Sequence, residues 1–215
     1  ERKLEEMRKD FVASVSHDLK TPIGIIEGYA EGLKDGIATG EDALVYLETI
    51  IDEAHKMNKL VTNMLELSKL ESGNLELVME RFNILRLIQK IIKSFKLEFD
   101  SKDIKLALKT NLEYCYILGD VFQLEQAITN LLSNALKYTP NGNEVIVEVN
   151  SNGELATVSI ENKGAYIPED EIVNLYNKFY RIDKARNSSN NSNGLGLAIV
   201  KRILTLHESS YSLFN

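Results

Sequence analysis

The sequence is poor in several residue types, and each shortage excludes a class of protein. One cysteine, Cys115, rules out an internal disulfide and a zinc site built from several cysteines. No apolar run approaches the roughly 20 residues that span a bilayer, and no secretory signal is visible. The formal net charge of −7 argues against wholesale binding of nucleic acid. Proline is nearly absent from residues 1–71, where Pro22 stands alone.

The remaining composition is that of an ordinary globular protein. Hydrophobic residues make up 44% of the chain and charged residues 27%, and 215 residues suit one or two domains. The chain begins at Glu1, inside a stretch of helical character and without an initiator methionine. We therefore expect it to be a piece of a longer protein.

Residues 1–73 are predicted to form a helical hairpin. Apolar residues recur at steps of three or four, the spacing of an amphipathic helix, on both sides of a glycine-containing break at 34–42. Thr39 is the expected N-cap of the second helix, which should end at Ser72–Gly73. A lone hairpin cannot bury both stripes, so we expect a second copy to complete a dimeric four-helix bundle. The stripes include Val15, Leu19, Ile23, Ile26 and Leu33, and then Leu44, Leu47, Ile50, Leu60 and Leu67.

His17 does not belong to the apolar stripe of the first helix. It lies two residues from Val15 and two from Leu19, and two residues turn a helix by roughly 200°. The imidazole is therefore predicted to face solvent, with Asp18 and Thr21 leaning to the same side. Pro22 follows inside the helical pattern and is expected to kink it.

From Leu75 onward, strand-like and helix-like segments alternate. We expect an α+β sandwich, with one sheet covered by helices on one face. A strand is predicted within "NLELVMERFN", and two more in "IKLALKT" and "CYILG". "NEVIVEVNS" and "LATVSIEN" suggest a hairpin, and "ESSYSLFN" suggests one last strand. The predicted helices are "ILRLIQKIIKSFKLEF", "VFQLEQAITNLLSNALKY" (with Asp120 as its cap) and "GLGLAIVKRILTLH".

Three segments of this second part have the residue types of a nucleotide site. Asn130 and Asn134 share a helix face with Lys137 close by, and two amides and an ammonium could hold a metal ion and phosphate oxygens. The same spacing also fits a solvated polar face. Asn162 and Gly164 follow a strand, where an amide could pair with a base edge or the segment could be an ordinary turn. Gly194 and Gly196 open a helix whose first N–H groups attract anions, just after the polar segment 187–193.

Taken together and in this order, the segments resemble a sensor histidine kinase of bacterial two-component signalling. "SHDLKTP" is similar to the phospho-acceptor box of the dimerisation and histidine-phosphotransfer domain. "NLLSNALKYT", "NKGAYIP", "KFYRIDKA" and "GLGLAIVKRI" are similar to the asparagine, first glycine, phenylalanine and second glycine boxes of a GHKL-type (Bergerat-type) ATPase fold. The resemblance covers essentially the whole chain. It implies a phosphotransfer domain at 1–73 and an ATP-binding domain at 74–215, with C-terminal strands missing.

The resemblance assigns a role to each matching residue. His17 would attack the γ-phosphate of ATP, Asp18 would accept or orient its imidazole proton, and Thr21 would orient water for dephosphorylation of the partner. Asn134 would ligate Mg²⁺ with Asn130 in support. The other implied nucleotide contacts are Lys137 and Arg181 to phosphate, Tyr138 near the nucleoside, Asn162 at the adenine amino group, Gly164 in its turn, and Gly194 and Gly196 beside the triphosphate.

The resemblance also implies partners and a location. These are a homodimer through the hairpin, the receiver domain of a response regulator, and a membrane reached only through a segment upstream of this chain. The catalytic part would lie in the cytoplasm, beneath the inner membrane of a bacterium.

The chain departs from the family at three places. Asn162 stands where the family usually has aspartate, Tyr166 replaces the second glycine of that box, and the glycine pair expected after "LTLH" is absent. One alternative is therefore a pseudokinase that binds, and perhaps dephosphorylates, a regulator. A GHKL ATPase of another kind is disfavoured, because Asn130 occupies the place of its water-activating glutamate. His55 and His207 lack a comparable setting, and we predict no catalytic role for them.

Overall fold

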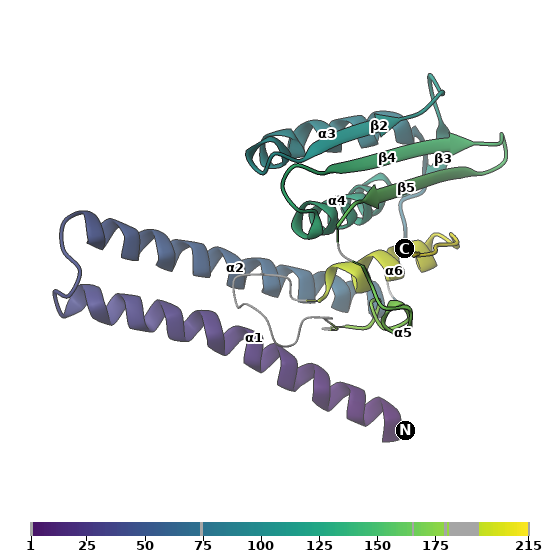
Figure 1. The fold of residues 1–215 in the computed structure, drawn as a ribbon. Helices are drawn as coiled ribbons and strands as arrows, with labels where there is room; N and C mark the ends of the chain where they lie inside the picture. Colours follow the sequence, from purple (N-terminus) through teal and green to yellow (C-terminus); the bar gives the residue numbers. More distant parts are fainter. Residues whose placement is uncertain (1, 74, 165, 179, 181–193, 215) are drawn as a thin grey trace.

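A long helical hairpin and a compact α/β part make up the molecule (Figure 1). The computed structural model describes residues 2–73, 75–164, 166–178, 180 and 194–214. Two long helices come first, α1 (Arg2–Lys34) and α2 (Glu41–Glu71). The remaining elements are β1 (Glu80–Asn83), α3 (Ile84–Ser101), β2 (Lys105–Lys109), β3 (Tyr116–Gly119), α4 (Val121–Tyr138), β4 (Glu144–Ser151), β5 (Ala156–Asn162), α5 (Glu169–Ile172) and α6 (Gly196–Leu206).

The structure confirms that residues 2–73 form a helical hairpin, and it corrects the predicted N-cap of the second helix. Helix α1 continues through Pro22, and α2 ends at Glu71 with Ser72 as its C-cap. The expected N-cap Thr39 is wrong, because Gly40 takes that position and offers no side-chain hydrogen bond. Glu41 and Asp42 occupy the first turn instead, where their negative charge complements the helix dipole. Within the described ranges, no helix combines the length and the hydropathy that crossing a bilayer requires.

Part of the hairpin's apolar surface remains uncovered in the single chain. Leu44 is 60% exposed, Leu47 45% and Ile51 52%, although all three belong to an amphipathic helix. Their neighbours on the α1-facing side, including Ile50 and Met57, are partly buried. The hairpin thus has a second apolar face in addition to the one that joins its two helices.

The strands of the second part form two sheets rather than the single sheet expected from the sequence. In the larger one, β4 is central, parallel to β2 and antiparallel to β5. β1 and β3 pair antiparallel with each other in a separate two-stranded ribbon. The alternation of apolar residues identifies strands but not their partners, because strand pairing depends on distant residues.

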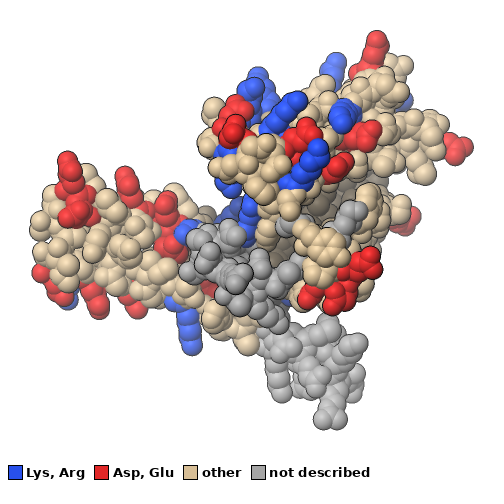
Figure 2. Space-filling model, viewed as in Figure 1, with Lys and Arg blue, Asp and Glu red and all other residues tan. Residues whose placement is uncertain are grey.

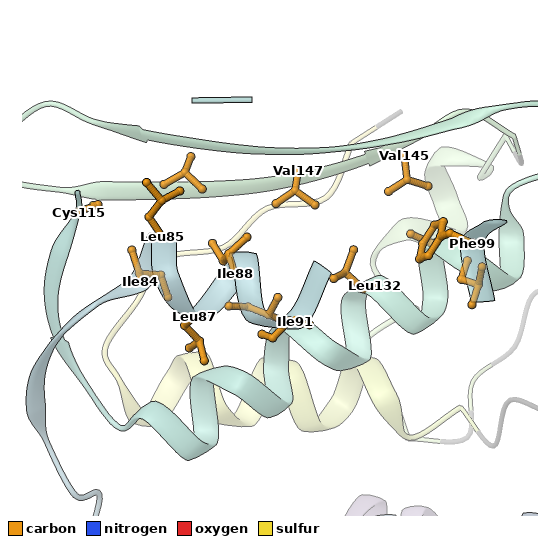
Figure 3. Packing of buried hydrophobic residues seen from close by; sticks show 14 of the residues in the cluster. Ile84, Leu85, Leu87, Ile88, Ile91, Phe99, Cys115, Leu132, Val145 and Val147 are labelled. Atoms are coloured by element: carbon orange, nitrogen blue, oxygen red, sulfur yellow. The ribbon is translucent and has the colours of Figure 1, made fainter. Parts of the chain in front are cut away.

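The core lies between the larger sheet and helices α3 and α4 (Figure 3). Val145, Val147 and Val149 alternate along β4, and each is fully buried beneath the two helices. Ile88 of α3 and Leu132 of α4 meet them with no exposed surface. This period-two pattern on the strand and the amphipathic faces of the helices confirm that helices cover one face of the sheet.

Helix α6 packs between α4 and α2 and so connects the two parts of the molecule (Figure 1). A second apolar cluster joins Leu60, Leu67 and Leu70 of α2 to Ala127 of α4. The α6 members of the cluster include Ala198, Ile199, Val200 and Ile203, all buried. Helix α6 therefore buries one face on each neighbour.

The C-terminal segment corrects another expectation. "ESSYSLFN" was expected to be a strand, yet residues 209–214 have no regular secondary structure. After α6, Glu208 adopts a positive φ of 53°, and the Ser209 N–H donates to the Leu204 carbonyl, so the chain turns at the helix end. The Tyr211 ring then packs edge-on against the Tyr176 ring with their centroids 5.1 Å apart. Residues 209–214 therefore contact the segment after α5 through these two rings and do not pair as a β-strand.

Candidate functional site

The imidazole of His17 projects from the surface of α1. Its side chain is 83% exposed, which confirms the prediction from helical phase. The Nδ1 atom lies 3.5 Å from Oδ1 of Asp18, whose side chain is 26% exposed. The carboxylate thus stands beside one ring nitrogen and leaves Nε2 facing solvent. An exposed nitrogen with an acidic neighbour on its other side has the arrangement of an accessible nucleophile.

Thr21 and Pro22 complete this first group of residues. The Thr21 hydroxyl is exposed and donates to the His17 carbonyl oxygen, four residues back along the helix, at 3.3 Å. Pro22 is buried and carries no N–H, so the usual bond from position 22 to the Asp18 carbonyl is lost. The hydroxyl of Thr21 therefore lies on the same surface as His17, one turn further along α1.

The predicted nucleotide residues of α4 lie on its half-buried surface. Asn130, Asn134 and Lys137 are each partly exposed. The Nδ2 atom of Asn130 is buried and has no hydrogen-bond partner in the part of the chain that the structure describes. A buried amide N–H without a partner is costly, so this atom is suited to a ligand acceptor. The Lys137 ammonium lies over the Tyr138 ring, 5.1 Å from its centroid.

Both glycine boxes lie against α4, at different heights along it. A methyl group placed on Gly164 would stand 2.6 Å from the Tyr138 carbonyl oxygen, so this glycine packs on the C-terminal end of α4. A methyl group on Gly196 would stand 3.8 Å from Oδ1 of Asn130. Helix α6 therefore begins beside Asn130, and its N-cap residue Leu195 offers no side-chain hydrogen bond. Free N–H groups at a helix start favour anions.

The remaining predicted residues divide into described and undescribed ones. Asn162 is the last residue of β5, pairs in register with Val145, and is exposed. Gly194 precedes α6 with a positive φ of 60°, a conformation that glycine adopts readily. Arg181 and the polar segment 187–193 lie outside the described residues. Among the described residues, no three His, Cys, Asp or Glu side chains cluster as a metal site, so a metal here would rely on amide, phosphate and water oxygens.

The His17 group and the α4 group are on different helices, and the larger contacts between these helices run through two others. Contacts run from α1 to α2, from α2 to α6 and from α6 to α4 (Figure 1). The residues of each group were predicted from the sequence. In the structure, the α2–α6 interface lies between the two groups.

Polar contacts between α2 and the α/β part were not predicted from the sequence. The Arg202 Nε–H donates to the Leu70 carbonyl at 2.8 Å, and the Lys178 ammonium lies 2.6 Å from the Glu71 carboxylate. The amide of Gln126 also donates to the Glu66 carboxylate. These partners are 60 to 132 residues apart, and no local pattern indicates such pairs. Nor did the short helix α5 have a recognisable signal.

The sequence analysis predicted Asp120 as a helix cap and predicted no catalytic role for His207. Asp120 caps α4 as predicted, accepting from the Gln123 N–H at 3.0 Å. Its own backbone N–H donates to Nε2 of His207 at 3.0 Å. Cys115 is buried as expected, and burial raises the pKa of its thiol.

Comparison with known proteins gives two domain matches. Residues 7–73 match the family described as "His Kinase A (phospho-acceptor) domain". Residues 119–213 match the family described as "Histidine kinase-, DNA gyrase B-, and HSP90-like ATPase". The first contains the His17 group and the second contains α4, α6 and both glycine boxes.

Whole-chain relatives agree with the domain matches. The "Sensor protein SrrB" of Staphylococcus aureus is 32% identical over 214 residues, which are 98% of this chain and 36% of that protein. The chain thus spans about a third of the length of the curated relatives it matches. The structure of the Acinetobacter baumannii histidine kinase AdeS is similar with a TM-score of 0.70 and 25% identity, covering 88% of this chain and 86% of that one. A structure of the histidine kinase ThkA in complex with the response regulator protein TrrA shares the fold, with a TM-score of 0.71 and 24% identity over 84% of this chain and 53% of that one.

Proposed function

The chain belongs to the sensor histidine kinases, and we propose on that premise that it phosphorylates itself on His17 with ATP and passes the phosphoryl group to an aspartate of a response regulator. The observation that carries the proposal is the exposed imidazole with Asp18 on its Nδ1 side. We infer that residues 1–73 form the dimerisation and phosphotransfer domain and residues 74–215 the ATP-binding domain.

The proposed reaction uses the two ring nitrogens differently. Nε2 of His17 attacks the γ-phosphorus of ATP, the bond from that phosphorus to the β–γ bridging oxygen breaks, and ADP leaves. The proton on Nδ1 faces the Asp18 carboxylate, which stabilises the positive charge that develops on the ring. The phosphoryl group then passes from Nε2 to a carboxylate oxygen of the regulator. Solvent exposure of His17 serves both steps, because two different partners must reach the same atom.

The nucleotide is proposed to bind along α4 between the two glycine boxes. The Nδ2 atom of Asn130 has no partner among the described residues, and α6 begins beside it with no side-chain cap from Leu195; both support a phosphate-binding role for this surface. Mg²⁺ would neutralise phosphate charge, held by the Asn134 carbonyl together with phosphate and water oxygens. The other proposed contacts are Lys137 and Arg181 with phosphate, Tyr138 with the nucleoside, Asn162 with the adenine amino group, and Gly164, Gly194 and Gly196 at the edges of the site.

A phosphatase activity toward the regulator is also proposed. Thr21 lies one turn beyond His17 with an exposed hydroxyl, where it could orient a water molecule. The hydroxyl's bond to a backbone carbonyl fixes the donor and leaves its lone pairs available.

The proposed partners are a second copy of the chain and a response regulator. The exposed apolar residues of α2 support a dimeric four-helix bundle through the hairpin. ThkA, which has the same fold, forms a complex with the regulator TrrA, and this supports a receiver domain as the partner. Figure 2 shows Asp and Glu side chains gathered at the end of the hairpin where α1 turns into α2, a surface that would repel nucleic acid. We place the chain in the bacterial cytoplasm, attached to the inner membrane only through an upstream segment.

One observation favours the pseudokinase alternative. Asn162 lacks the negative charge that strengthens a hydrogen bond to the adenine amino group, and Tyr166 is 75% exposed in the same turn. Under this alternative the protein binds and dephosphorylates the regulator without using ATP.

Incubation with γ-labelled ATP and Mg²⁺ distinguishes the two functions. The kinase predicts a label on the protein that is lost in acid, survives base and disappears in His17→Gln. His55→Gln is the matched control, because His55 is exposed on α2 and takes no part in the proposed reaction. Absence of label from the wild-type chain, with release of inorganic phosphate from a phosphorylated regulator that is supplied to it, would favour the pseudokinase.

A further inference from the structure

His207 joins the end of α6 to the start of α4 through both of its ring nitrogens. Nε2 accepts a hydrogen bond from the Asp120 backbone N–H at 3.0 Å, and Nδ1 lies 2.8 Å from the Ile203 carbonyl oxygen. Because a backbone N–H can only donate, Nε2 must be the acceptor and Nδ1 must carry the proton. The ring is therefore a neutral imidazole in one fixed tautomer.

Asp120 connects this contact to two further elements. Its carboxylate accepts from the Gln123 N–H at the start of α4 and from the Val78 N–H just before β1, each at 3.0 Å. The residue is 7% exposed, so these bonds lie in the interior. Gly119 next to it lies close to the imidazole, since a methyl group there would stand 3.5 Å from Cδ2 of His207. His207 is thus bonded to a rigid, buried corner of the domain.

The other end of the same helix pair is the proposed nucleotide site. Helices α4 and α6 run in opposite directions, because Asp120 is beside His207 at one end and Asn130 is beside Gly196 at the other. Asn130 is ten residues after Asp120, and Gly196 is eleven residues before His207. Both distances correspond to about three helical turns. A shift at the His207 end would therefore be transmitted along α6 to the residues that border the phosphates.

We propose that His207 is a positioning residue of the ATP site: its Nδ1 bond to Ile203 orients the ring, and its Nε2 bond to the Asp120 N–H fixes α6 on α4 and so sets the distance between Gly196 and Asn130. The proposal rests on the proposed function of this surface. Helix α6 has only 11 residues, and its N-cap residue Leu195 offers no side-chain hydrogen bond, so interactions within the helix do not fix its position on α4. Apolar packing on α4 and α2 is not directional, and the imidazole supplies a contact that defines how far α6 extends along α4.

Two substitutions separate the bond to Asp120 from the bond to Ile203. Gln places an acceptor oxygen at the ε position and keeps the bond to the Asp120 N–H. Asn places a donor at the δ position and keeps only the bond to the Ile203 carbonyl. Ile203→Val is the control for a general loss of stability, because it removes one methyl group from a fully buried residue of α6 and leaves the imidazole in place.

The measurements are the dissociation constant for Mg-ATP and the ATP dependence of His17 phosphorylation, on the full chain at a temperature where each variant is folded. We expect His207→Asn to raise both the dissociation constant and KM about tenfold, with the rate at saturating ATP changed by less than about twofold. His207→Gln and Ile203→Val should remain within about twofold of the wild type on both quantities. If the Asn variant does not fold, His207→Met, which fills the space without either hydrogen bond, is expected to show the same tenfold increase.

Different results overturn the inference and the proposed function. Equal KM values for the Gln and Asn variants, or an Ile203→Val value as high as that of Asn, would show that His207 only contributes stability. A wild-type chain that fails to bind Mg-ATP would overturn the ATP site itself, and this inference with it.

Discussion

Gly164 packs so closely on the end of α4 that a methyl group on it would stand 2.6 Å from the carbonyl oxygen of Tyr138. The same methyl group would stand 2.7 Å from Cδ of Pro140, and neither neighbour is a flexible side-chain end. At Gly196 the nearest atom to such a methyl group is Oδ1 of Asn130 at 3.8 Å, an ordinary contact. A side chain therefore has no room at Gly164 in the first glycine box, whereas the second glycine box has room for a methyl group at Gly196.

Alanine substitution should show this difference as a difference in stability. We expect Gly164→Ala to lower the free energy of unfolding by about 1–3 kcal/mol, because the backbone of α4 must shift to admit the methyl group. Gly196→Ala should leave stability unchanged or raise it by up to about 1 kcal/mol, since alanine favours a helix. Urea unfolding followed by circular dichroism measures both, and equal values for the two variants would contradict the packing described here.

Asp18 should control the rate of phosphorylation without affecting nucleotide binding. Asp18→Asn removes the carboxylate 3.5 Å from Nδ1 of His17, so the imidazole would develop charge in the transition state without a counterion. Loss of a positioned acid–base partner typically slows a reaction by about 10²–10⁴-fold. We expect a decrease in that range in the initial rate of acid-labile label incorporation, with an unchanged dissociation constant for Mg-ATP. Full activity in Asp18→Asn would remove Asp18 from the proposed mechanism.

The exposed apolar face of α2 predicts a dimer. A single charged substitution on this face should weaken the dimer. Leu47 is 45% exposed in the single chain, between Leu44 and Ile51. In a four-helix bundle, Leu47→Lys would bury an unpaired ammonium, and we expect the dimer to dissociate at least tenfold more readily. Light scattering after gel filtration, over a range of protein concentrations, measures this. Val78→Lys is the matched control, because Val78 is 73% exposed and lies outside the hairpin.

The Glu144–Lys163 pair predicts a defined pH dependence of stability. Its hydrogen bond, 2.9 Å long, lowers the pKa of Glu144 below the ordinary 4.5 and raises that of Lys163 above 10.5. A lowered carboxyl pKa contributes stability above the unfolded-state value, and this is lost as the pH falls through the folded-state value. A raised lysine pKa contributes stability below its unfolded-state value, which is lost as the pH rises through the folded one.

The pair should therefore stabilise the protein between these limits and at neither extreme. We expect the difference in urea midpoint between the wild type and Glu144→Gln to be constant from about pH 6 to 9 and to shrink below about pH 4. The effect should be small and should decrease in high salt, because the Lys163 side chain is exposed to solvent and the Glu144 side chain is partly exposed. A difference that grows on acidification would have the wrong sign for this pair.

Local signals in the sequence were sufficient for most elements and for both groups of site residues. Helix α4 is found at the predicted residues 121–138 because Asp120 caps its start and Thr139–Pro140 ends it. The exposure of His17 followed from its phase relative to Val15 and Leu19, which depends only on helical geometry.

Features that depend on distant residues were not predicted. The separation of the β1–β3 ribbon from the larger sheet depends on which strands pair, and the contact between Arg202 and Leu70 depends on how α6 docks on α2. The predicted N-cap of α2 was wrong for a different reason. Thr39 and Gly40 both suit a helix start by residue type, and the positive φ of 60° at the cap favours glycine.

Helix α6 takes part in two interfaces, one with α4 and one with α2 of the hairpin. The packing of α6 on α4 is coupled to the packing of the α/β part on α2, because Ile199 of α6 and Leu67 of α2 belong to the same apolar cluster. A change in one of these two interfaces would therefore change the stability of the other. By thermodynamic reciprocity, separation of the two halves would change the affinity for any ligand that α6 helps to bind, by the same factor as that ligand changes the separation. Through this eleven-residue helix, a movement of the hairpin would thus change the affinity of the proposed nucleotide site.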